Sequence, residues 1–165
     1  MKKEVTKEMA FEKLAALCSR SEQCEFDLNR KMINWGLSSA NRKEVLESLR
    51  NYHFVDDARF AKSFTNDKAR FSSWGPNKIK IELIKRKITQ SDIIKALNEV
   101  DKSVWKEGLL RCATSKSKHL DLTGEEAWES KQKLFRYLIS RGFPSSAVSK
   151  VINFIKKKQE ELQDD

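Results

Sequence analysis

The sequence predicts an all-α protein, built as a tandem array of three three-helix repeats that is elongated or curved. The composition favours helices, because only 5 Gly and 2 Pro occur among 165 residues and helix-forming residues such as Leu, Lys, Glu and Ala are abundant. Apolar residues recur at three- and four-residue spacing along most of the chain, which is typical of amphipathic helices. The same apolar pattern returns three times, ahead of Gly36-Leu37, Lys87-Ile88 and Gly142-Phe143.

The first repeat is predicted to occupy residues 1–54. One helix is expected over about 6–19, a second from a Ser21 cap to Gly36, and a third from near Asn41 to Tyr52. A serine side chain can accept a hydrogen bond from the amides of a helix's first turn. A glycine can adopt the left-handed backbone that ends a helix.

The second repeat is predicted over residues 55–100. Asp56 or Asp57 can cap its first helix, and Trp74-Gly75-Pro76 should interrupt the chain before Pro76 starts the next helix. This second helix should close near Lys87-Ile88. Ser91 should then cap a short third helix.

The third repeat is predicted over residues 101–165. A helix should start near Ser103, a polar loop should follow over 115–124, and a second helix should cover 125–141. Gly142-Phe143-Pro144 is a stop signal, after which Ser145 should cap the last helix. The charged tail from residue 156 is expected to fray.

The three repeats share a register of apolar residues before each elbow. The positions eight, four and three residues ahead of the elbow are, in order, Leu28, Ile79 and Leu134; Met32, Leu83 and Leu138; and Ile33, Ile84 and Ile139. After the elbow, Val45, Ile93 and Val148 correspond if the loop of the first repeat carries three extra residues. One unit of this size cannot bury its own apolar face, so neighbouring repeats should share core.

The charge balance favours a polyanionic partner. The net charge is +9 and the isoelectric point about 9.5, which suits nucleic acid, a nucleoprotein assembly or an anionic membrane, although a soluble surface can be equally basic. The middle repeat holds the densest excess, with Lys78 and Lys85 on one side of its second helix and Lys80 and Lys87 on another. The candidate binding residues are Lys78, Lys80, Lys85, Arg86, Lys87, Lys131, Lys133, Arg136 and Arg141.

Signals for catalysis, cofactors and membrane insertion are missing from the sequence. His53 and His119 lack the spacing of a zinc site, and no phosphate-binding loop or nucleophile motif occurs. No apolar run approaches the roughly 20 residues of a membrane span. Three cysteines without a C-x-x-C motif favour a reducing compartment, so the protein is expected in the cytoplasm. We therefore predict a binding protein without metal or cofactor.

The run from Tyr52 to Ala61 is similar to the signature of the RecX family. The matching signature residues are Asp56, Asp57, Arg59, Phe60, Ala61 and, further on, Gly75. The family's Leu-x-x-Lys-Gly-Ile-like ending resembles residues 83–88, with Lys87 where glycine is more usual. Its Leu-x-x-Arg-Gly-Phe ending resembles residues 138–143. The resemblance spans about residues 10–155, and we expect the signature residues to be structural, with the aspartates capping a helix rather than binding metal.

This resemblance implies three three-helix repeats and a regulatory role in recombination, DNA repair and the SOS response. It implies binding to the RecA recombinase filament on single-stranded DNA, with inhibition as the main effect. We expect a monomer that contacts the DNA directly or through the filament. Two alternatives remain: a helix-turn-helix DNA-binding protein that uses residues 76–86 and 91–99, and a helical adaptor that binds protein only. Trp35 and Trp74 could stack on bases or pack between repeats.

Overall fold

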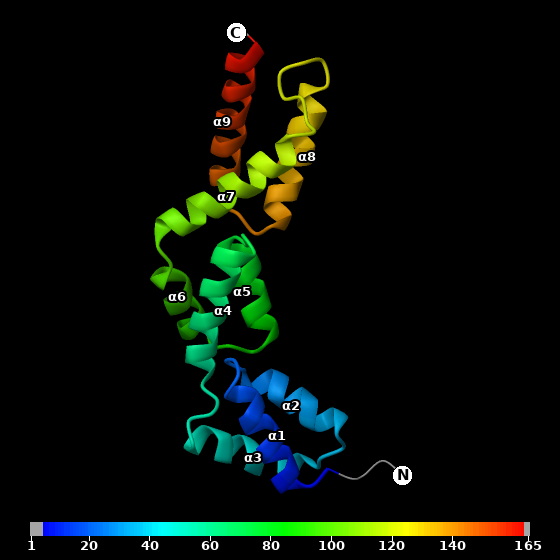
Figure 1. Cartoon of the computed structure of the whole chain (residues 1–165), viewed down its shortest axis with the longest axis vertical. Helices are drawn as coiled ribbons and strands as arrows, with labels where there is room; N and C mark the ends of the chain where they lie inside the picture. The colour runs from blue at the N-terminus through cyan, green and yellow to red at the C-terminus, as the bar shows by residue number, and fades with distance from the viewer. Residues whose placement is uncertain (1–4, 164–165) are drawn as a thin grey trace. The chain divides into compact units, whose positions relative to one another are not determined.

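The computed structural model describes residues 5–163, and all the regular secondary structure in this range is α-helical (Figure 1). The all-α prediction is therefore confirmed. The helices are α1 Lys7–Cys18, α2 Glu25–Asn34, α3 Ser39–Asn51, α4 Asp57–Phe71, α5 Pro76–Lys85, α6 Gln90–Glu99, α7 Lys102–Ser117, α8 Ala127–Ser140 and α9 Ser145–Gln163. No helix between residues 5 and 163 combines the length and the apolar content that crossing a bilayer requires.

Contacts between residues divide the chain into two compact units. The first holds the described residues up to 64 together with residues 83–96, and the second holds residues 65–82 together with the described residues from 97 onwards. The predicted repeat boundaries after residues 54 and 100 do not coincide with these units. The residues of the middle repeat are divided between the two units.

The core of the first unit is formed where α1 and α2 pack against α3 (Figure 1). Its buried side chains are Ala10, Leu14, Ala15, Leu28, Met32, Leu37, Val45, Leu49 and Val55. At its edge, the Phe11 ring makes edge-on contacts with Tyr52 and Phe54, both at 6.0 Å between ring centres. The burial of so many aliphatic side chains is the main source of stability for this unit.

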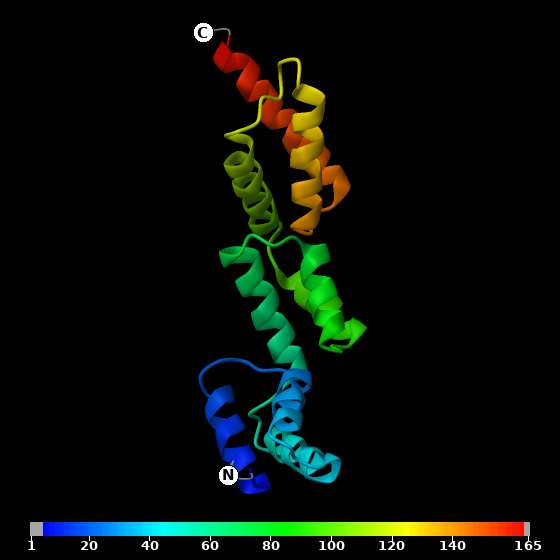
Figure 2. The same cartoon turned by 90° about the vertical axis from the view of Figure 1, so that its right-hand side faces the viewer.

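The core of the second unit is formed by α7, α8 and α9, which pack against one another (Figure 2). Its buried residues are Leu109, Cys112, Ala113, Leu122, Leu134, Leu138, Phe143, Val148, Val151, Ile152 and Ile155. The spacing of these residues along each helix follows the three- and four-residue period of the sequence, so one stripe of each helix faces the core.

The three elbows have the same backbone conformation, which confirms the register of the repeats. Gly36, Lys87 and Gly142 all have positive φ, at 82°, 58° and 94°. In each elbow two amides donate to carbonyls of the last helical turn, with the 6→1 and 5→2 pattern of a Schellman motif. These bonds are Leu37 to Met32 and Gly36 to Ile33, Ile88 to Leu83 and Lys87 to Ile84, and Phe143 to Leu138 and Gly142 to Ile139.

One set of the recurring apolar positions lies on the outside of the helices. Ile33, Ile84 and Ile139 are 50%, 49% and 39% exposed, whereas the residues that precede them, Met32, Leu83 and Leu138, are fully buried. Adjacent helical residues point about 100° apart, and the buried stripe is too narrow to include both. The isoleucines therefore belong to the repeat pattern but not to the core.

Lys87 occupies the left-handed position that Gly36 and Gly142 take in the other repeats. A non-glycine residue in this conformation costs roughly 1–2 kcal/mol, so Lys87→Gly should raise the free energy of unfolding by about 1 kcal/mol. Urea unfolding followed by circular dichroism measures the change. As a control, Lys85→Gly removes a lysine from the last turn of α5 and should lower stability by about 1 kcal/mol. A loss of stability in Lys87→Gly would contradict the strained elbow.

Several predicted caps are wrong, and at α2 and α6 other side chains cap the helix instead. Ser21 does not cap α2, whose flanking residue is Cys24 and makes no side-chain cap bond. Thr89 replaces Ser91 at α6: the Asp92 amide donates to Thr89 Oγ1 at 3.2 Å, and the Thr89 hydroxyl donates to Asp92 Oδ2 at 2.7 Å. Ser145 is itself the first residue of α9.

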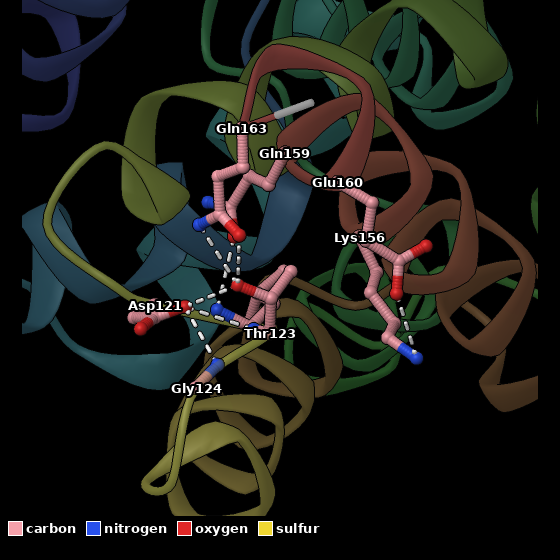
Figure 3. A network of polar contacts seen from close by, with 8 residues as sticks. Asp121, Thr123, Gly124, Lys156, Gln159, Glu160 and Gln163 are labelled. Atoms are coloured by element: carbon pink, nitrogen blue, oxygen red, sulfur yellow. Dashed lines mark hydrogen bonds and ion pairs between the residues drawn. The ribbon is translucent and has the colours of Figure 1, made fainter. Parts of the chain in front are cut away.

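The predicted loop over 115–124 and the frayed tail are both partly helical. The seventh helix continues to Ser117 and the ninth to Gln163. In α9, Gln159 bonds to the loop ahead of α8, accepting from the Leu122 amide and donating to the Leu120 carbonyl, both at 2.9 Å. One turn later Gln163 donates to Thr123 Oγ1 at 3.0 Å (Figure 3). These long-range bonds hold the charged end of α9 against the loop. Residues 164–165 lie outside the described part of the chain.

Candidate functional site

The two signature aspartates cap two different helices. The Asp56 side chain accepts a hydrogen bond from the Arg59 amide at 2.9 Å, so it caps α4. The Asp57 side chain instead accepts from the Glu25 amide at 2.9 Å and supplies the cap that Cys24 lacks at α2. Burial raises the pKa of the Asp57 carboxyl, and the bond from Glu25 opposes that shift. Among the described residues, no cluster of His, Cys, Asp and Glu could hold a metal ion.

Removing the Asp56 cap should have a moderate effect on stability. Asp56→Ala leaves an amide of the first turn of α4 without its acceptor, and we expect a loss of about 1 kcal/mol. Asp56→Asn keeps a side-chain oxygen and should lose less than half as much. Thermal unfolding followed by circular dichroism would compare the two variants, and equal losses would mean that the charge rather than the hydrogen bond matters.

The remaining signature residues fasten the start of α4 to the first repeat. Arg59 Nε donates to Glu22 Oε1 at 2.5 Å, and its Nη2 donates to the His53 carbonyl at 3.1 Å. Arg59 therefore pairs with a neighbouring repeat and not with either aspartate. Phe60 and Ala61 are buried, and the Phe60 ring stacks on Phe64 at 5.5 Å. The signature residues therefore form a joint: their side chains connect the start of α4 to the first repeat.

Gly75 makes a second joint, inside the second compact unit. Its amide donates to the Arg141 carbonyl at 2.7 Å, and the Asn77 amide donates to the Gly142 carbonyl at 3.0 Å. A Cβ atom on Gly75 would lie 2.3 Å from the carbonyl carbon and oxygen of Gly142. Only glycine permits this approach between the start of α5 and the end of α8.

Two of the predicted binding residues belong to this joint. The Lys78 ammonium lies 4.3 Å from the Trp74 ring centre, with the Lys68 ammonium 4.9 Å from the same ring. Arg141 donates through Nη2 to the Ser72 carbonyl. The contacts of Lys78 and Arg141 are thus internal to the unit, and Trp74 packs against lysine side chains while its stacking on bases stays an open alternative.

Three further candidates lie at the end of α5, in the first compact unit. Arg86 Nε lies 3.2 Å from Asp27 Oδ2, and its guanidinium covers the Phe64 ring at 5.2 Å. Lys85 is exposed on the last turn. Lys87 lies beyond the helix, with its ammonium 6.0 Å from the Phe26 ring centre. The prediction that Lys80 and Lys87 share a side of one helix is wrong, because α5 ends at Lys85.

A polar cavity of about 430 Å³ brings Arg86 and Lys87 together with cations that sequence reasoning missed. Its lining includes Phe26 of α2, Arg42 and Lys43 of α3, Asp57 of α4, and Arg86 and Lys87. Arg42 and Lys43 belong to the first repeat, in which basic residues exceed acidic ones by less than in the middle repeat. Their adjacency near the start of a helix is the signal that could have identified them, but 45 residues of sequence separate Arg42 from Lys87.

The last four candidates lie on two exposed surfaces. Lys133 and Arg136 are exposed and three residues apart, so they share a face of α8, while Lys131 is half-buried. Lys80 is exposed on α5. Among the described residues, none of these four cations has a carboxylate within ion-pair distance. The predicted residues therefore do not form one surface. Those with contacts inside their own unit, in the cavity lining and on the exposed surface are, in order, Lys78, Arg86 and Arg141; Lys87; and Lys80, Lys133 and Arg136.

Two parts of the chain match known domains. Residues 56–97 match the description "RecX, second three-helix domain", and residues 116–152 match "RecX, third three-helix domain". The chain is also similar to two solved structures, which show the fold. One is a crystal structure of regulatory protein RecX, with a TM-score of 0.76 and 22% identity, covering 89% of this chain and 71% of the other. The second is RecX from Lactobacillus salivarius, with a TM-score of 0.73 and 16% identity, covering 89% and 94%.

Curated relatives agree with these domains. The chain is 31% identical over 134 residues to "Regulatory protein RecX" of Clostridium tetani (strain Massachusetts / E88), covering 81% of this chain and 61% of the relative. It is 29% identical over 147 residues to the protein of the same name from Haemophilus influenzae (strain PittEE), covering 87% and 93%. The chain thus spans about three-fifths of the Clostridium tetani relative and nearly all of the Haemophilus one. With two of its three-helix domains matched in order and its fold shared, the chain belongs to the RecX family.

Proposed function

We propose that this protein is a non-catalytic regulator that binds the RecA recombinase filament on single-stranded DNA and restrains its activity in recombination, DNA repair and the SOS response. The names of the relatives, each called a regulatory protein, support a regulatory rather than an enzymatic role. The proposed contact surface rests on three exposed cations of α5 and α8 that have no ion-pair partner among the described residues. They are Lys80, Lys133 and Arg136. A reducing cytoplasm suits its three free thiols.

Cations of this kind suit a nucleoprotein filament for a physical reason. A lysine or arginine without a carboxylate partner is available to a phosphate or to an acidic protein surface, and phosphate contacts release condensed counterions. Arg86 and Arg141 suit this role less, because their guanidinium groups already bind Asp27 and the Ser72 carbonyl. We propose that the protein acts as a monomer and contacts the single strand directly or through the filament.

The decisive experiment measures RecA ATPase activity and strand exchange, using the recombinase of the same organism, with and without this protein. The triple variant Lys80→Glu, Lys133→Glu and Arg136→Glu should inhibit at least about tenfold less well. If DNA is bound directly, the salt dependence of binding should fall by about one unit of slope for each phosphate that the variant no longer binds.

A matched control has the same change in net charge. Lys102, Lys106 and Lys150 are also exposed lysines, and their replacement by glutamate should leave inhibition nearly unchanged. Equal losses in both triple variants would reject the proposed surface, and no effect of the wild-type protein on the recombinase would reject the function. Binding to filaments without any affinity for free single-stranded DNA would identify a contact with protein only.

A further inference from the structure

The polar cavity beside Lys87 has the size of a site for a small molecule. Its volume is about 430 Å³, and pockets for small ligands measure roughly 300–1,000 Å³. The cavity lies wholly within the first compact unit, between the first turns of α2, α3 and α4 and the elbow after α5. Most of its lining is charged or polar, so an apolar ligand would leave these groups without partners.

Three cationic groups around the cavity have unused capacity to bind an anion. Among the described residues, Lys43 and Lys87 have no carboxylate within ion-pair distance. The half-buried Arg42 is held in place by its Nε, which donates to Asn29 Oδ1 at 3.0 Å, and by its Nη1, which donates to the Leu37 carbonyl at 2.7 Å. Its Nη2 has no such bond, and a fixed guanidinium with a spare donor suits a phosphate oxygen.

An aromatic ring and a carboxylate oxygen add two further binding groups. The rest of the lining consists of Glu25, Asn29, Ser39, Leu46 and Arg86. Phe26 is half-buried, and the Lys87 ammonium already approaches its ring at 6.0 Å. Flat rings of this kind stack on nucleobases. Asp57 uses Oδ1 to accept from the Glu25 amide, while its Oδ2 has no hydrogen bond within residues 5–163. A free carboxylate oxygen is an acceptor for a ring or exocyclic N–H group.

We infer that this cavity binds one nucleoside phosphate. The phosphate lies against Lys43, Lys87 and Arg42, the base stacks on Phe26, and Asp57 accepts from an N–H group of the base. A bare inorganic anion would leave Phe26 and Asp57 unused, and a divalent cation would be repelled by the surrounding lysines. The same ligand chemistry has two sources, a free nucleotide or one unit of a single strand. The inference is independent of the proposed filament binding and can fail or hold separately.

The test measures binding of dAMP to the full chain by nuclear magnetic resonance. Resonances of the cavity residues should shift and saturate at millimolar dAMP, and deoxyadenosine or inorganic phosphate should each bind at least about tenfold more weakly. The double variant Lys43→Glu with Lys87→Glu and the single variant Phe26→Leu should each weaken dAMP binding by about tenfold or more while helicity is retained. Binding of inorganic phosphate as tight as that of dAMP would overturn the inference.

A control pair and a second ligand make the test specific. Lys31 and Lys95 are exposed lysines outside the cavity, and their replacement by glutamate should leave dAMP binding unchanged. The site belongs to a strand if an oligodeoxyadenylate binds more tightly per nucleotide than dAMP and depends equally on Lys43 and Lys87. It belongs to free nucleotides if dATP binds more tightly than both. Absence of shifts with every nucleotide, or equal weakening by the control pair, would reject the site.

Discussion

Gly75→Ala should destabilise the protein by about 3 kcal/mol, because the new methyl group has no space. Its Cβ would lie 2.3 Å from the carbonyl atoms of Gly142 and 2.5 Å from the Phe143 amide. These neighbours are backbone atoms and cannot rotate away, so the start of α5 must separate from the elbow after α8. Overpacking typically costs roughly 1–3 kcal/mol, and the bonds from Gly75 to Arg141 and from Asn77 to Gly142 would weaken as well.

The measurement is urea unfolding followed by tryptophan fluorescence, with Gly108→Ala as the matched control. Gly108 lies inside α7, where an added Cβ meets no atom closer than 3.7 Å. Alanine is about 1 kcal/mol better than glycine in a helix interior, so this variant should gain stability. A Gly75→Ala protein as stable as the wild type would mean that the backbones do not approach so closely in solution.

Leu138→Ala should cost about 3 kcal/mol, within the range of roughly 2–5 kcal/mol for buried leucines. Leu138 is fully buried in the core formed by α7, α8 and α9. Its carbonyl also accepts the bond from Phe143 that closes the elbow. Truncation leaves a cavity in a core that Leu134 and Val148 already fill, and the rigid neighbouring helices can close it only in part.

Ile139→Ala is the matched comparison, because it changes a neighbouring residue of the same helix that is not buried. Ile139 follows Leu138 directly on α8 but is 39% exposed, so less apolar area is lost, and alanine's higher helix propensity offsets part of that loss. We expect a change below about 1 kcal/mol. Thermal unfolding of both variants under one set of conditions tests the difference. Similar losses would contradict the outward position of the isoleucine, which the sequence pattern alone does not distinguish from the buried leucine.

Local features of the fold could be predicted because they depend on residues a few positions apart. The left-handed backbone at Gly36 and Gly142 follows from the lack of a side chain at glycine, and the aspartate cap of α4 follows from a carboxylate next to free amides. The wrong caps have the opposite cause. Ser21 is a good capping residue, but the Glu25 amide at the start of α2 donates to Asp57 instead. These two residues are 32 positions apart, so no local sequence pattern contains the bond.

The candidate site depends even more on contacts between residues that lie far apart in the sequence. The basic residues in α5 and just after it can be counted from the sequence, but their different roles cannot be told apart there. Arg86 meets Asp27 across 59 residues, Lys78 meets the Gly142 backbone, and Lys87 faces a cavity with Arg42 and Lys43. Charge alone does not distinguish a lysine that packs on a tryptophan from one that is available to a phosphate.

The sequence by itself determined the helical class, the three repeats, the elbow positions and the family resemblance, because apolar spacing and turn residues act over single helical turns. Only the tertiary structure decided which partners those elements meet. It paired Asp57 with the start of α2, brought Gly75 against Gly142, and assembled cations from α3 and the elbow after α5 around one cavity. Such contacts depend on how helices pack, and packing is set by the combined shape of side chains that lie far apart along the chain.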